Sequence, residues 1–551
     1  MTKFSQHFIF SALMFVVQTT YASEIAKDKN KSGKKPDTKE SVDSPFRISK
    51  ETTRILEPVH PDAYMDYVAA LNESANQGVK PEDNAAVALN LLACWSKKES
   101  DEPMEEIWFN IFDRLNALDL MKSADSPIFV SYYNFNNHED LELTARVISE
   151  NKYKNALRID QDLTHSTEVE QYLIKNKHVV EYLINEVSKP QFFDPIIMPV
   201  IPFGSYNVTK YKQFAELLLL QTRYSNSAGN QQDAIKSLKA LFQITRHLKC
   251  SKVFLDRHTG FYFNVKASQL AATMIQSQNI SPETLKQISI LLNSEERVPE
   301  TWQFVDETHR FELLQIIQLY YLGLHKSDQA EFMEMPNTDR LDSLLASQKV
   351  DWDSSLIIAN SMIDELVKLA ITKSGMEYRE AKRNFKNTYF SDPMADKMIK
   401  DAALITASRL LRFKDSEKRN GKFVGTFFAL WMMTETYESR EPFLENEEWI
   451  ELTKVALDIK TYQLKHSKLP KSLNELYKDL DRESPQSIFG EPFVYLVEGE
   501  NYHLYSKGID GIAQDGIWHD KIKNGKGISD DIGIYTKQLV NIEAELDTDG
   551  M

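Results

Sequence analysis

Apolar residues recur at helical spacing along most of the chain between residues 51 and 465. In Tyr211–Thr222, Asp233–Leu248, Ala267–Ser277 and Pro282–Leu292 they follow the i, i+3, i+4, i+7 pattern of one buried helix face. Short polar connections separate these segments, so the helices are expected to pack as antiparallel hairpins. Ser281 supplies a capping hydroxyl directly before Pro282, which is typical of a helix start.

Similar patterns predict further helices on both sides of this region. The segments are 61–77, 81–95, 104–118, 138–151, 168–188, 310–324, 354–374, 394–412, 421–438 and 447–466. The stretch Phe192–Asn207 contains three prolines and cannot form one helix, so we expect an extended connector there.

The pattern changes after residue 466. Ser472 and Glu475 have the spacing of a capping box, which predicts a short helix. Phe493–Val497 and Tyr502–Tyr505 alternate and carry aromatic residues, as strands do, and the residues between them are typical of a hairpin turn. Ile532–Tyr535 is expected to add a third strand.

Glycine usage follows the same division. Nine of the 18 glycines lie after residue 480, and the other nine are spread over the much longer part before it. A glycine-poor chain of this length excludes a large all-β protein, which needs turns throughout. The predicted fold class is therefore mainly α: a multi-helix body of antiparallel hairpins with a small C-terminal α+β domain containing a short antiparallel sheet.

The first 22 residues resemble a secretory signal peptide. Lys3 precedes the ten-residue apolar core Phe8–Val17, and Ala22 ends a suitable cleavage site. Ten apolar residues are too few to span ~30 Å of hydrocarbon, so we expect cleavage, no stable transmembrane segment afterwards, and export to the periplasm or outside a bacterial cell. The expected segments are signal peptide 1–22, disordered linker 23–50, N-terminal helical region 51–200, helical-hairpin region 201–445, α+β domain 446–540 and flexible tail 541–551.

Charge and cysteine content restrict the function further. The net charge is −16, and the one lysine-dense stretch, 26–50, is part of the predicted linker. A nucleic-acid partner is therefore not expected, because a phosphate-binding surface needs a local basic patch. Export would permit a disulfide between Cys94 and Cys250, but their apolar, helix-like surroundings favour buried free thiols.

Sequence motifs of catalysis are missing. The chain has no HExxH, GxSxG, GxGxxG or GxxxxGK[ST]. The densest polar groups, His138-Glu139-Asp140 and Glu445–Glu448, are better explained as solvated helix starts than as sites. We therefore expect a non-enzymatic protein. An exported hydrolase with its site in the helical body and a tetratricopeptide-like peptide-binding scaffold are the alternatives.

Two segments of the body resemble a group of exported bacterial proteins without an assigned activity. Gly78–Ala86 reads GVKPEDNAA, against GVxPExNAA in that group, and Leu238–Leu248 is similar to its central helices. The resemblance implies a helical scaffold and provides no catalytic residues.

The C-terminal domain, from the expected helix 447–466 to Ile532, resembles the corresponding part of the major pseudopilin of type II secretion. That family has a long helix, a YPxSLxxL step, DPWGxPYxY, YxLxSxGxDG and a final DDI. The matching residues here are Leu469, Pro470, Ser472, Leu473, Leu476, Phe489–Tyr495, Tyr502, Leu504, Ser506, Gly508, Asp510, Gly511 and Asp530–Ile532. The processed pilin start is missing from this sequence. The resemblance therefore implies the fold of this domain and envelope or secretion-related interactions with a protein partner, and not assembly into a filament.

The resemblance also implies a Ca²⁺ site, because the final loop of that family binds Ca²⁺. The ion prefers six to eight oxygen ligands. Carboxylates would come from Asp510, Asp530 and Asp531, and carbonyl groups from the strand end, Leu504 and Ser506. Asp515 and Asp520 are further candidates. The alternative interpretation of this acidic segment is a solvated turn without metal.

Overall fold

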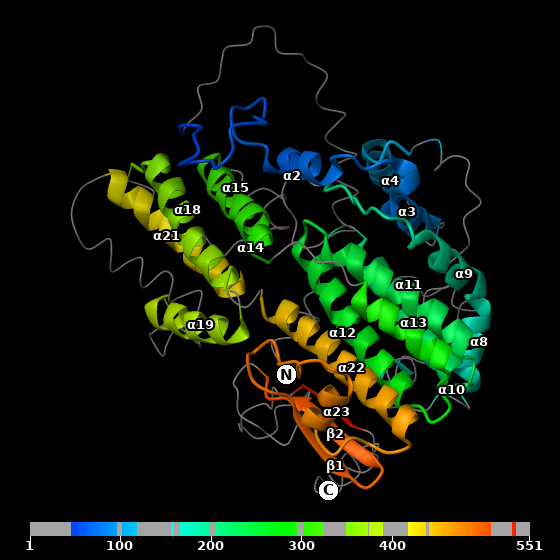
Figure 1. The fold of residues 1–551 in the computed structure, drawn as a ribbon. Helices are drawn as coiled ribbons and strands as arrows, with labels where there is room; N and C mark the ends of the chain where they lie inside the picture. The colour runs from blue at the N-terminus through cyan, green and yellow to red at the C-terminus, as the bar shows by residue number, and fades with distance from the viewer. Residues whose placement is uncertain are drawn as a thin grey trace, which may run out of the picture.

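The computed structural model describes residues 46–95, 102–117, 119, 156–158, 163, 166–197, 205, 207–294, 301–323, 349–372, 374–389, 417–436, 440–508 and 532–535. Within these ranges the chain is mainly helical and has a small antiparallel sheet near its C-terminus, which confirms the predicted fold class (Figure 1). In this part of the chain no helix is long and apolar enough to cross a membrane. The expected helices 138–151 and 394–412, the signal peptide and the tail lie outside these ranges, as does all but the end of the linker.

Short helices form the N-terminal part of the body. They are α2 (Tyr67–Asn76), the 3₁₀ helix η2 (Pro81–Asp83), α3 (Ala85–Trp95), α4 (Glu102–Arg114), α8 (Thr167–Lys175) and α9 (Lys177–Glu186). The single helix expected over 168–188 is divided at Asn176, which is fully buried and lies between α8 and α9. The described part of the proline-rich connector, residues 191–197, is not helical, as predicted.

Four helices pack together in the middle of the chain: α10 (Val208–Ser227), α11 (Gln231–Lys249), α12 (Phe254–Gln276) and α13 (Pro282–Asn293). The first three form consecutive hairpins, and α13 packs against α11. The Ser281 hydroxyl accepts from the Thr284 backbone N–H at 3.1 Å, which confirms the predicted cap of α13. Helix α12 begins well before the expected start at residue 267, and Gly260 lies inside it. A Cβ at Gly260 would lie 2.6 Å from the Lys249 backbone nitrogen, so this glycine permits the close approach of α11 and α12.

A second group of helices surrounds a separate apolar core. It consists of α14 (Thr301–Phe304), the π-helical turn η3 (Val305–His309), α15 (Arg310–Tyr321), α18 (Trp352–Ala370), α19 (Gly375–Tyr389) and α21 (Glu417–Thr436). Helices α18 and α21 pack along their lengths (Figure 1). The N-terminal residues contribute to the same core through Phe46.

The C-terminal part contains α22 (Glu441–His466), α23 (Leu473–Asp479), β1 (Val494–Glu498), β2 (Asn501–Ser506) and β3 (Ile532–Tyr535). The sheet is antiparallel and includes the third strand, as predicted, and its strand order is β1-β2-β3. The capping box is confirmed. The Ser472 hydroxyl accepts from the Glu475 N–H at 3.2 Å, and the Glu475 carboxylate accepts from the Lys471 N–H at 2.8 Å.

Helix α22 connects the sheet to the body. It lies between α12 and the sheet in Figure 1, and its residues Leu452, Val455 and Ile459 are buried against the sheet residues Leu504 and Ile534. Phe489, from the segment before β1, instead enters the core of the second helix group. The C-terminal part therefore packs into more than one core.

Candidate functional site

The described chain contains two of the five residues expected to bind Ca²⁺. Leu504 and Ser506 lie on β2, whereas Asp510, Asp530 and Asp531 lie outside the described residues, as do Asp515 and Asp520. Ser506 pairs with Ile532, the first residue of β3. This pairing places the end of β2 next to the start of β3.

Polar groups fix the end of β2. The Ser506 hydroxyl lies 3.1 Å from the Ser487 hydroxyl and accepts from the Gly508 N–H at 3.4 Å. Gly508 has a φ of 64°, which glycine adopts at no steric cost. Its carbonyl oxygen accepts from the Arg379 guanidinium at 3.2 Å, so α19 contacts the residues that directly follow β2.

A buried carboxylate lies beneath the same strand end. Glu448 is fully buried on α22, and its Oε2 accepts from the Ile488 N–H at 2.9 Å. Burial raises the pKa of Glu448, and the hydroxyls of Ser487 and Ser506 oppose that shift. Interpreting Glu445–Glu448 as a solvated helix start is therefore wrong for Glu448. The α+β unit covers this face of α22. The sequence around Glu448 does not indicate that another part of the chain buries this residue.

A second polar group lies inside the body and was not identified from the sequence. Asp194, in the extended connector, accepts from the Asn90 side-chain amide at 2.9 Å and from the Tyr211 hydroxyl at 2.7 Å. Asp256, in the first turn of α12, accepts from the Ser205 N–H and from the Ser251 hydroxyl, both at 3.1 Å.

The Asp256 side chain is fully buried, whereas Asp194 is partly exposed. Burial raises the pKa of Asp194 to about 6. Burial is also the main cause that raises the pKa of Asp256 to about 7, and the charge of Asp194 adds to it. The charge of Asp194 therefore favours a proton on Asp256 near neutral pH.

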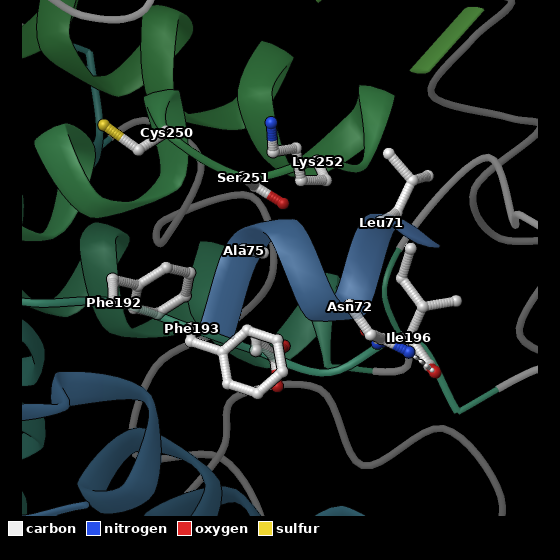
Figure 2. A pocket seen from close by; sticks show the side chains of 10 residues that line it. Leu71, Asn72, Ala75, Phe192, Phe193, Ile196, Cys250, Ser251 and Lys252 are labelled. Atoms are coloured by element: carbon white, nitrogen blue, oxygen red, sulfur yellow. Dashed lines mark hydrogen bonds between the residues drawn. The ribbon is translucent and has the colours of Figure 1, made fainter. Parts of the chain in front are cut away.

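Asp194, but not Asp256, lines a surface hollow, which Figure 2 shows from close by. It lies between α2, the connector and the turn before α12, and has an empty volume of about 300 Å³, open solvent included. Asp194 and Ser251 line it, together with Leu71, Asn72, Ala75, Phe192, Phe193, Ile196, Cys250 and Lys252. Asn72 and the backbone of Ile196 exchange two hydrogen bonds of 2.8 Å, which fix one wall.

Cys250 at this hollow is exposed, and Cys94 is half-buried; both are thiols. The expectation of two buried thiols is wrong for Cys250, because it follows the last residue of α11 and lies in the turn to α12.

Local sequence signals do not reveal the pair. Asp194 follows two phenylalanines and precedes Pro195, and a charged residue in such an apolar, proline-rich stretch is the one available sign. Asp256 looks like an ordinary acid in the first turn of a helix.

Comparisons with known proteins give no relatives. No family model, no curated protein and no solved structure matches this chain. Among the described residues no group of three or more His, Cys, Asp or Glu side chains is placed to hold a metal ion.

Proposed function

We propose that this chain is an exported, non-enzymatic scaffold whose C-terminal unit is pseudopilin-like, binds Ca²⁺ and takes part in envelope or secretion-related interactions with a protein partner. The order of elements supports this proposal: a long helix, a short capped helix, a β-hairpin and a third antiparallel strand. The same order follows from the sequence resemblance.

One observation carries the Ca²⁺ part of the proposal. Because Ser506 and Ile532 are paired, the segment that follows β2 and the segment that precedes β3 start from adjacent positions. Asp510 and Asp531 belong to these two segments, close in sequence to the pair. Carboxylates at both ends of one segment can therefore contribute to one oxygen site, which suits Ca²⁺.

Thermal unfolding with and without Ca²⁺ tests this proposal. EDTA should lower the Tm of the full chain and added Ca²⁺ should restore it, because a ligand at a hundred times its Kd stabilises by about 2.7 kcal/mol. The double variant Asp510→Asn/Asp531→Asn should lose the response. Glu500→Gln, which removes an exposed acid of the hairpin turn, should keep it. An unchanged Tm together with no calorimetric heat of Ca²⁺ binding would refute the metal site.

The Asp194 carboxylate at the hollow favours a second candidate, an exported hydrolase. Asp194 has a raised pKa and lines a solvent-open hollow, as a general acid or base requires, and its charge helps to raise the pKa of the fully buried Asp256. The experiment is a panel of chromogenic ester, glycoside and peptide substrates. Asp194→Asn and Asp256→Asn should each lower turnover at least ~100-fold, whereas Asp233→Asn, which changes a solvent-exposed side chain in the first turn of α11, should not. A panel without turnover, or turnover that both variants retain, would exclude this candidate.

A further inference from the structure

Strand β1 forms one edge of the sheet. Within the described chain it pairs with β2 alone, through the register Val494↔Tyr505 to Glu498↔Asn501. Leu496 is 51% exposed and Val497 is 40% exposed, so two large apolar side chains of this strand lie open to solvent.

The hairpin turn determines which backbone groups of β1 are unused. Only Gly499 and Glu500 separate the closing pair Glu498 and Asn501. In such a two-residue hairpin the closing pair exchanges hydrogen bonds, and bonded and non-bonded pairs then alternate along the strands. The N–H and C=O groups of Tyr495 and Val497 therefore face away from β2, toward the open edge.

The usual protection of a sheet edge is weak here. Exposed edge strands normally carry lysine, proline or a bulge, which prevent pairing with another strand. Residues 494–498 read VYLVE, with no lysine or proline and with Glu498 as the one charge. This edge is therefore open to a further strand.

We propose that β1 of a second copy of this chain pairs antiparallel with this edge, around a two-fold axis at Leu496. In this register Tyr495 lies opposite Val497 of the second copy, so the outward N–H and C=O groups of both residues meet. An aromatic residue opposite a β-branched one is a favourable cross-strand pair. The two sheets would join into a single continuous sheet.

The strand's sequence favours a second copy over an unrelated peptide. The register is self-complementary, as a two-fold interface must be. Leu496 meets Leu496 of the second copy, and Glu498 lies opposite Val494, so no like charges face each other directly. The proposal does not depend on the function proposed above.

The same features predict a weak dimer. One short strand buries far less surface than a stable protein–protein interface does. Each copy also carries a net charge of −16, and repulsion between the copies is screened as salt rises. The dimer should therefore increase with both protein concentration and NaCl.

Sedimentation equilibrium of the full chain tests the proposal, at low and high NaCl and over a range of protein concentrations. Val497→Pro removes one outward N–H and leaves the β1–β2 hydrogen bonds intact, and Leu496→Lys places a charge at the axis. Each variant should weaken dimerisation at least tenfold. Ile290→Lys, on an equally exposed apolar site of α13, should leave it unchanged. Circular dichroism checks that all variants are folded.

Three results would overturn the proposal. One is a monomer at every concentration and salt, and another is a dimer that both β1 variants retain. The third is a protein that stays monomeric while its β1 edge binds a basic peptide, with an affinity that falls as salt rises.

Discussion

The proton of Asp256 affects how the start of α12 is held. Its carboxyl group ties this helix to Ser205, at the end of the connector, and to Ser251, in the preceding turn. Burial and the charge of Asp194 favour the neutral acid, with a pKa of about 7 against 3.8 for an exposed aspartate. The folded state thus binds a proton that the unfolded state has already lost.

This difference predicts a loss of stability with rising pH. Above pH 4 the unfolded chain releases the proton of Asp256, whereas the folded chain keeps it until about pH 7. The free energy of unfolding should therefore fall between these values by up to about 4 kcal/mol, and this contribution should be constant above pH 7. Asp256→Asn should flatten the fall, measured by urea unfolding at pH 5 and 7.5.

Asp233→Asn is the matched control. Asp233 is exposed near the start of α11, where Lys236 lowers its pKa, so its substitution should leave the slope between pH 5 and 7.5 unchanged. Equal slopes for the wild-type protein and Asp256→Asn would show that this proton does not control stability.

Individual residues were predictable where their partners are close in sequence. Ser281 and Ser472 cap helices through residues three positions away. Asp194 and Asp256 were missed because they act through partners far along the chain: Asn90 contacts Asp194, and Ser205 contacts Asp256. A one-dimensional pattern contains no such information.

Among the elements, glycines set how closely some helices approach. Gly421 and Gly425 lie one turn apart on α21 and face the backbone of α18. A Cβ at Gly425 would lie 2.2 Å from the carbonyl oxygen of Ser355, and the Ser355 hydroxyl donates to the Gly421 carbonyl at 2.8 Å. These two helices are therefore in direct backbone contact.

Gly425→Ala should destabilise the protein by about 1–3 kcal/mol, because the new methyl group separates α18 from α21. The higher helix propensity of alanine, worth ~1 kcal/mol, opposes the loss without reversing it. The free energy of chemical unfolding measures the balance. Lys418→Ala, at an exposed position of the same helix, should change it by less than about 0.5 kcal/mol. An equal or higher stability of Gly425→Ala would contradict the close contact.

The helical elements could be predicted because their apolar periodicity is strong. Their ends could not be predicted in those places where tertiary packing determines them. Gly260 reads as a helix breaker in sequence, yet α12 continues through it because the residue contacts α11. Asn176 reads as a tolerable helix residue, yet α8 ends there.

For the molecule as a whole, the chain does not divide simply into domains, because α22 packs into more than one core. It begins at Glu441, before the boundary expected at residue 446, and contributes Leu444 to the second helix group and Leu452 to the core beneath the sheet. Phe489, in the segment before β1, belongs to the core of the second helix group. Gly375 leaves room for the Phe489 ring because it has no side chain. Its N–H donates to the Ile488 carbonyl at 2.9 Å. Sequence composition marks the turn-rich part correctly and contains no sign of this contact.

The core that contains Phe489 also contains Phe46, near the other end of the described chain. Contacts between residues so distant in sequence form slowly, because a long loop must close before they contribute any stability. This core is completed only after residue 489 has left the ribosome, so nearly the whole chain has to be synthesised first. The position of one phenylalanine thus delays final folding of this half of the molecule to the last stage of synthesis or later.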